Sequence, residues 1–254
     1  MRKSVLLPAA AVAGGVVGLV VRRVYLANGF EAGTGLPIAG APSLWAMAIV
    51  TVVVLGLLVA LSCGKHKNYT QCYTGAFYSE HTVCIAGMLA GAVLLGVVGC
   101  LALANWFSSP SLGLMEKPLR RELSVTWLYL GIFCLLAAAG IYFVTQKMRQ
   151  KEPILTAWAA MPTLAGCLWV VANYYDHWAE EPVLGHYAIP MLATGLSMLG
   201  CMMIGAMGFD KARVSTTLAF SLSGASVCIM ALADGLNWAN TAILLGMVFY
   251  QLSM

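Results

Sequence analysis

Charge is scarce in this sequence, and the shortage excludes several classes of protein. Charged residues make up 9% of the 254 residues, whereas hydrophobic residues make up 61%. An average soluble domain is about 25% charged and about 45–50% apolar. So few charges do not solvate the surface of a soluble domain this size, and the mean hydropathy of +0.84 agrees. A soluble enzyme, a disordered chain and a nucleic-acid-binding protein are therefore excluded, and the lipid bilayer is the expected partner.

Common catalytic, metal-binding and nucleotide-binding motifs are missing as well. The sequence has no C-x-x-C, no H-E-x-x-H and no G-x-S-x-G. The glycine-rich stretch Gly29–Gly35 lacks the Gly-Lys-Ser/Thr of a P-loop. Six of the eight cysteines fall within apolar runs, where cysteine packs as a small hydrophobe. The sequence therefore predicts no disulfide framework and indicates no cofactor.

Long apolar runs are what the sequence does have. A helix needs about 20 mostly apolar residues to cross the hydrocarbon core, and lipid-exposed backbone must be helical to satisfy its polar groups. The prediction is an all-α polytopic bundle forming a single membrane domain over residues 1–254. Eight spans are preferred, and seven are possible because the last run is short. The predicted spans are Ser4–Val21, Ser43–Cys63, Val83–Phe107, Val125–Gln146, Pro153–Tyr175, His186–Phe209, Val214–Ala233 and Asn237–Leu252.

The basic residues predict the orientation of the bundle. With the N-terminus inside, the inner segments carry nine Lys and Arg and the outer segments five, including Arg22 and Arg23. Cytoplasmic segments carry the excess of positive charge, so we expect both termini inside. The run after Arg2 and Lys3 is too long for a signal peptide and is followed by Arg22. It is therefore interpreted as an uncleaved first span.

Small residues and prolines within the runs predict how the helices pack. Gly14-x-x-x-Gly18 and Gly87-x-x-x-Gly91 let helices approach closely, within the chain or between two copies. Pro162 and Pro190 each remove a helical hydrogen bond and predict a kink in the fifth and sixth spans. Such kinks either open a cavity or only curve the bundle.

The densest polar cluster lies between the fifth and sixth spans, at the expected outer face. If the helix continues there, a histidine and a glutamate fall four residues apart on one face. Together with the neighbouring acid and histidine they form a weak candidate for a divalent-metal site, and the alternative is a solvated acidic loop. The four candidate ligands are Asp176, His177, Glu181 and His186.

A second candidate site surrounds Asp234, which follows the seventh span. A carboxylate inside lipid is costly and marks an ion or solute path. The alternative is that Asp234 reaches the outer headgroups. The residues assigned to the candidate path are Asp234, Asn237, Asn173, Tyr174 and Tyr187.

Haem ligation between helices is a further possibility to weigh. Haem is held by histidines on facing helices, but none of the four histidines lies in the middle of a span. His177 and His186 are placed to meet at the outer boundary, and His66 and His81 at the inner one. A quinol site requires only a polar pocket near one interface, so the sequence does not reject it.

Three segments carry a resemblance to known proteins. They are Gly29–Pro42, Asn173–Leu184 and Ala231–Asp234. In these segments the chain resembles a set of uncharacterised multi-pass membrane proteins of anaerobic Gram-positive bacteria. The resemblance implies a bacterial plasma membrane and an eight-span bundle, and it carries over no catalytic residue.

These observations favour a non-enzymatic integral membrane protein. The expected role is a small permease or a membrane subunit that binds partner subunits of a larger complex. The alternative is an intramembrane enzyme or a quinol- or haem-type redox anchor with its site at the outer corner of the fifth and sixth spans.

Overall fold

The structure is a computed structural model of the whole chain. It describes residues 3–31, 33–38, 40–63, 81–108, 118–150, 156–175, 183–207, 209 and 213–253. Within these ranges the fold is helical, and the one β-type pairing is an isolated bridge between Phe30 and Pro37. The predicted all-α class is confirmed.

Eight α-helices and one short 3-10 helix make up the described chain. Their bounds are α1 Lys3–Asn28, α2 Pro42–Ser62, α3 Thr82–Ser108, α4 Pro118–Gln150, α5 Thr156–Asn173, α6 Leu184–Met207, α7 Val214–Ala231, η3 Leu232–Asp234 and α8 Trp238–Ser253.

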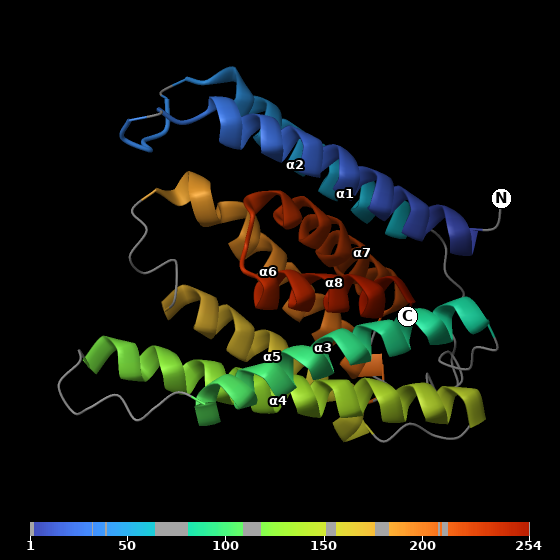
Figure 1. Cartoon of the computed structure of the whole chain (residues 1–254). Coiled ribbons are helices and arrows are strands. Elements are labelled where there is room, and N and C mark those ends of the chain that lie inside the picture. The colour runs from blue at the N-terminus through green and yellow to red at the C-terminus, as the bar shows by residue number, and fades with distance from the viewer. Residues whose placement is uncertain are drawn as a thin grey trace.

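Two helical hairpins enclose the remaining helices (Figure 1). The α1–α2 hairpin packs against α7 on one side, and the α3–α4 hairpin packs against α8 and α5 on the other. Helices α6, α7 and α8 therefore form the interior, and α7 and α8 are largely buried. The helices run back and forth along one axis, so both termini lie at the same end of the bundle (Figure 1).

Six of the helices are long and apolar enough to cross a membrane, namely α1, α2, α3, α4, α6 and α7. This makes the chain a multi-pass membrane protein. Helix α8 has 16 residues and a length of about 24 Å at 1.5 Å per residue, less than the roughly 30 Å of a hydrocarbon core. The α5 helix, with 18 residues, is also short and is not among these six.

The predicted close approaches occur within the chain. A Cβ on Gly18 would lie 2.5 Å from Met230 of α7, and one on Gly91 would lie 2.8 Å from the carbonyl oxygen of Gly246 in α8. Both small-residue pairs therefore serve intramolecular packing, which lets α1 reach α7 and lets α3 reach α8. Pro162 and Pro190 lie inside α5 and α6, as predicted.

The first span differs most from its prediction. Val21 was expected to end it, but α1 continues to Asn28, and the expectation that Arg22 belongs to an outer connector is wrong. The residues after the arginine pair are again mostly apolar (Val24, Tyr25, Leu26, Ala27). The helix therefore continues, and Arg22 lies six residues before its end, about 9 Å along the axis.

Candidate functional site: a buried ion pair beside a polar cavity

Arg22 is buried inside the helical bundle. Its side chain is 1% exposed and forms an ion pair with Asp234, whose side chain is 5% exposed. Nε of Arg22 donates a hydrogen bond to Oδ1 of Asp234 at 2.9 Å, and Nη2 donates a second one to the same oxygen. Nη1 donates to the carbonyl oxygen of Gly185 and Nη2 to that of His186, both at 2.9 Å. Arg22 thus joins α1 to the start of α6 and to the turn that follows α7.

Pro190 explains why α6 offers a carbonyl group to this arginine. In a helix the carbonyl of His186 accepts a hydrogen bond from the backbone N–H four residues later. That residue is Pro190, which has no N–H. The guanidinium of Arg22 supplies the missing donor. The proline predicted to kink the sixth span therefore also creates part of the arginine site.

Aromatic rings and a glycine close the other side of Arg22. Its Cζ atom lies 5.3 Å from the ring centroid of Tyr25, within the range of a cation–π contact. Tyr25 packs against Phe30, which in turn packs against the ring of His186 at a centroid distance of 4.2 Å. A Cβ on Gly185 would lie 2.5 Å from Oη of Tyr25, so any larger residue here would have to displace the tyrosine.

Asp234 ends the short helix η3, and Gly235 follows it with a φ of +63°. This left-handed residue turns the chain from α7 towards α8. Both hydrogen bonds from Arg22 go to Oδ1 of Asp234. The other oxygen, Oδ2, is buried and has no hydrogen-bond partner among the described residues. Half of the carboxylate therefore lacks a described hydrogen-bond donor.

A chain of amide hydrogen bonds lies near this carboxylate. Nε1 of Trp169 donates to Oδ1 of Asn240 at 2.8 Å, and Nδ2 of Asn240 donates to Oδ1 of Asn173, also at 2.8 Å. Nδ2 of Asn173 donates to the carbonyl oxygen of Trp169 at 3.1 Å. Each carboxamide has two N–H groups, so one N–H of each asparagine has no partner among the residues that the structure describes.

The carboxylate and the amide chain border one cavity of about 210 Å³, named here the carboxylate cavity. Asp234 is the one carboxylate in its described lining, and Arg22 is not part of that lining. The lining consists of Trp169, Asn173, His186, Tyr187, Pro190, Thr194, Asp234, Leu236, Asn240 and Leu244.

The structure brings several of the predicted site residues together. Asp234, Asn173, Tyr187 and His186 come from three separate segments and all line the carboxylate cavity. The Asp234 side chain is buried against Arg22.

Two other predicted path residues lie elsewhere. Oδ1 of Asn237 accepts a hydrogen bond from the backbone N–H of Asn240 at 2.8 Å, which is the helix-capping role of an N-cap residue. Tyr174 is 52% exposed, and its ring packs edge-on against that of Tyr175. Neither residue lines the cavity.

The predicted metal site falls largely outside the described residues. Asp176, His177 and Glu181 are not described, and of the four candidate ligands only His186 is placed. The predicted haem pairs each include one such residue, since His66 and His177 are also outside the described ranges. Among the described residues no group of three or more His, Cys, Asp or Glu is arranged to hold a metal ion.

Arg22, Trp169, Thr194 and Asn240 were not predicted as site residues. For Arg22 the sequence holds a signal, because an apolar stretch continues beyond the arginine pair. An arginine with apolar residues on both sides requires a buried partner or a route to water. For Trp169 and Thr194 we find no comparable signal.

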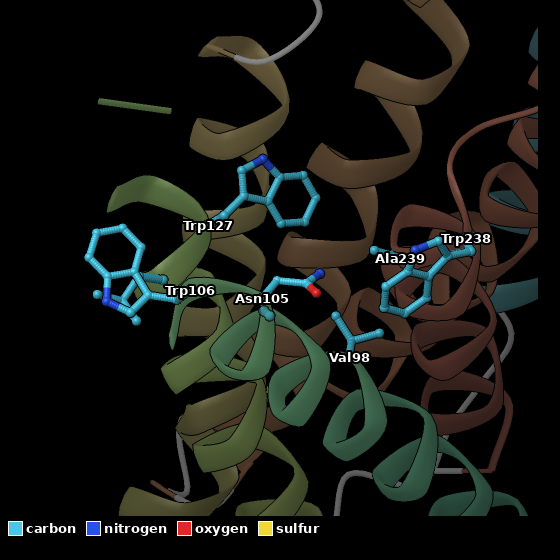
Figure 2. Close-up of a pocket in the computed structure, with 8 residues that line it drawn as sticks. Val98, Asn105, Trp106, Trp127, Trp238 and Ala239 are labelled. Atoms are coloured by element: carbon cyan, nitrogen blue, oxygen red, sulfur yellow. The ribbon is translucent and has the colours of Figure 1, made fainter. Parts of the chain in front are cut away.

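A second cavity lies on the other side of the first turn of α8 and is named here the tryptophan cavity. Its volume is about 220 Å³. In Figure 2 the carboxamide of Asn105 points into the space between Trp127 and Trp238, whereas the ring of Trp106 points away from it. Two rings therefore face this space rather than the three converging rings of an aromatic cage. The lining consists of Val98, Ala102, Asn105, Trp106, Trp127, Leu128, Trp238 and Ala239.

Another buried polar contact involves Gln251 of α8. Its Nε2 donates to the carbonyl oxygen of Ser197 at 2.7 Å and to the hydroxyl oxygen of the same residue at 3.0 Å. The carboxamide fits between Gly200 of α6 and Gly224 of α7, because a Cβ at either glycine would lie within 3.0 Å of it. This contact ties three interior helices together.

No family model, curated protein sequence or solved structure matches this chain.

Proposed function

We propose that the chain is a small permease and that the carboxylate cavity is its solute site. The observation that carries the proposal is the carboxylate of Asp234, which has one unpaired oxygen and is buried in the wall of a polar cavity between α5, α6 and α8. Carboxylates inside a membrane protein are costly and are typically retained for transport or proton movement. A cavity with a few convergent polar groups between the helices of a bundle is also a common form of ligand site.

The architecture supports this proposal over a purely structural role for the ion pair. An ion pair that only holds α1 against the rest of the bundle requires the Arg22–Asp234 contact, but it requires no cavity beside that contact. Here Asp234 and His186 take part in the arginine contact and also border the cavity. A bacterial plasma membrane, implied by the resemblance described above, is the proposed location.

Flux through purified protein tests the proposal. The protein is reconstituted into liposomes, and tracer uptake is measured for small polar solutes of each charge type: glycerol, urea, serinol and glycerate. We expect at least one solute to enter faster than it enters protein-free liposomes. Thr194→Leu adds volume to the cavity wall and should abolish this flux.

Thr51→Leu provides the matched control. Thr51 of α2 is buried, and its hydroxyl donates to the carbonyl oxygen of Met47 at 2.8 Å, much as Thr194 donates to that of Met191 at 2.9 Å. The control should retain the flux. The permease proposal would be overturned if no solute entered liposomes with wild-type protein faster than protein-free liposomes. Equal flux through Thr194→Leu and Thr51→Leu would also overturn it. If partner proteins then remain bound through purification, the membrane-subunit hypothesis takes its place.

The second candidate function is a quinol-binding redox anchor. It is favoured by the indole of Trp169 and the hydroxyl of Tyr187 in the same lining, beside the asparagine amides. A short-chain quinol that raises the unfolding temperature of the wild type, but not of Thr194→Leu, would support this candidate.

A further inference from the structure

We infer that the carboxylate cavity selects a neutral solute that donates an O–H or N–H hydrogen bond to Oδ2 of Asp234. The inference rests on the proposed function and names the class of substrate. It follows from three features of the cavity: the charge balance of its wall, the open carboxylate oxygen, and the free amide groups of the asparagines.

The charge balance disfavours an ion. Arg22 and Asp234 form a buried pair with no net charge, and Asp234 is the one carboxylate of the described lining. A bound cation would add an uncompensated positive charge, and a bound anion a negative one. A buried charge without a counter-charge is far more costly than a buried neutral group. A neutral solute preserves the balance.

The open oxygen specifies the hydrogen-bonding group. Arg22 makes four hydrogen bonds, two to Oδ1 of Asp234 and two to carbonyl groups of α6. None of these bonds goes to Oδ2, which has no partner in the described part of the chain. A buried acceptor without a donor is destabilising. A hydroxyl or amide N–H of the solute satisfies this oxygen.

The amide groups complete the description of the solute. Asn173 and Asn240 each keep one N–H without a described partner, so they can donate to an oxygen of the solute. Trp169, Leu236 and Leu244 form an apolar wall suited to a carbon skeleton. The class that fits is a small polyol, alcohol or amide with both donor and acceptor groups, within the volume of about 210 Å³.

Three solutes of matched size separate charge from shape. Glycerol is neutral, serinol carries a positive charge and glycerate a negative charge at neutral pH, and all three have a three-carbon skeleton. In the proteoliposome assay we expect uptake of glycerol above the protein-free rate, with serinol and glycerate at that rate. Uptake of serinol or glycerate equal to or above that of glycerol would overturn the inference while leaving a permease in place.

A double substitution tests the role of the open oxygen. Arg22→Met with Asp234→Leu removes both charges together, which avoids leaving one charge unpaired. We expect glycerol flux to fall at least about tenfold, since the solute loses a hydrogen bond to a charged group. Arg23→Met is the matched control, because Arg23 is exposed on the same helix, and it should leave the flux unchanged. Unchanged flux in the double variant would overturn the inference.

The same neutral hydroxyl group can also come from the ring of a membrane quinol. A short-chain quinol that stabilises the wild type but not the double variant, with no flux of any of the three solutes, would support the neutral donor and overturn the permease. If none of glycerol, serinol and glycerate is taken up and the quinol does not stabilise the wild type, both proposals are overturned.

Discussion

Removing the Arg22–Asp234 pair one partner at a time should cost far more stability than removing both. Each single change, Arg22→Met or Asp234→Leu, leaves a buried charge without its partner. Breaking a buried pair in this way typically costs about 3–5 kcal/mol. The side chains are 1% and 5% exposed, so the solvent screening that weakens surface pairs does not apply here.

Arg22 has a second contribution to stability because it also donates to α6. Without it, the carbonyl of His186 has neither the guanidinium nor a helical N–H, since Pro190 provides none. An unsatisfied buried acceptor costs about 1–3 kcal/mol. The double variant still pays for the unsatisfied carbonyl of His186, but it has no unpaired charge because both charged side chains are removed. The carbonyl cost is common to Arg22→Met and the double variant and cancels, so we expect the sum of the two single costs to exceed the cost of the double variant by at least about 3 kcal/mol, the lower bound for one unpaired buried charge.

Unfolding of the purified protein in a mild detergent, followed by circular dichroism against denaturant, measures this coupling. Arg23→Met is the control and should change stability by no more than about 0.5 kcal/mol, as surface substitutions usually do. Pro190→Ala returns an N–H to the carbonyl of His186 and should reduce the cost of Arg22→Met. Additive single effects, to within about 0.5 kcal/mol, would refute the argument that the two charges depend on each other.

Two further predictions concern packing and the amide chain. Gly185→Ala should destabilise the protein by about 1–3 kcal/mol through overpacking, because its Cβ would lie 2.5 Å from Oη of Tyr25, whereas Gly195→Ala has no atom within 4 Å and should be tolerated. Equal unfolding midpoints for the two variants would contradict this. Asn240→Ala should cost about 2–4 kcal/mol, because the indole N–H of Trp169 and the carboxamide oxygen of Asn173 would both lose their hydrogen-bond partner. Asn237→Ala should cost about 1 kcal/mol, because it removes a helix cap. A larger loss of thermal stability in Asn237→Ala than in Asn240→Ala would contradict these two values.

Most of the helical fold could be predicted from local sequence. The second span was expected at Ser43–Cys63, and α2 covers Pro42–Ser62. The agreement follows from the bilayer, which requires a helix wherever a long apolar run crosses it. The same rule failed at α1, because the arginine pair lowers the local hydropathy where the helix in fact continues to Asn28. A buried partner elsewhere in the chain offsets that lowered hydropathy, and the local pattern does not reveal the partner.

The candidate site was predictable only in its parts. Asp234 was singled out because a carboxylate beside an apolar run is costly, and Asn173, Tyr187 and His186 because they cluster near the ends of the fifth and sixth spans. The ion pair joins residues 212 positions apart, and the link between Trp169 and Asn240 spans 71 positions. Spacing along a helix relates residues three or four apart, so it predicts neither contact.

By itself, the sequence determined that this chain lies in a membrane as a bundle of helices, because charge content and apolar run length decide the solvent of each segment. Only the tertiary structure decided that the carboxylate of Asp234 is neutralised by Arg22, that Pro190 frees a carbonyl for the same arginine, and that a cavity remains beside them. The reason is physical. The residue type alone shows that a buried charge is costly. Which group offsets that cost depends on which helices pack together.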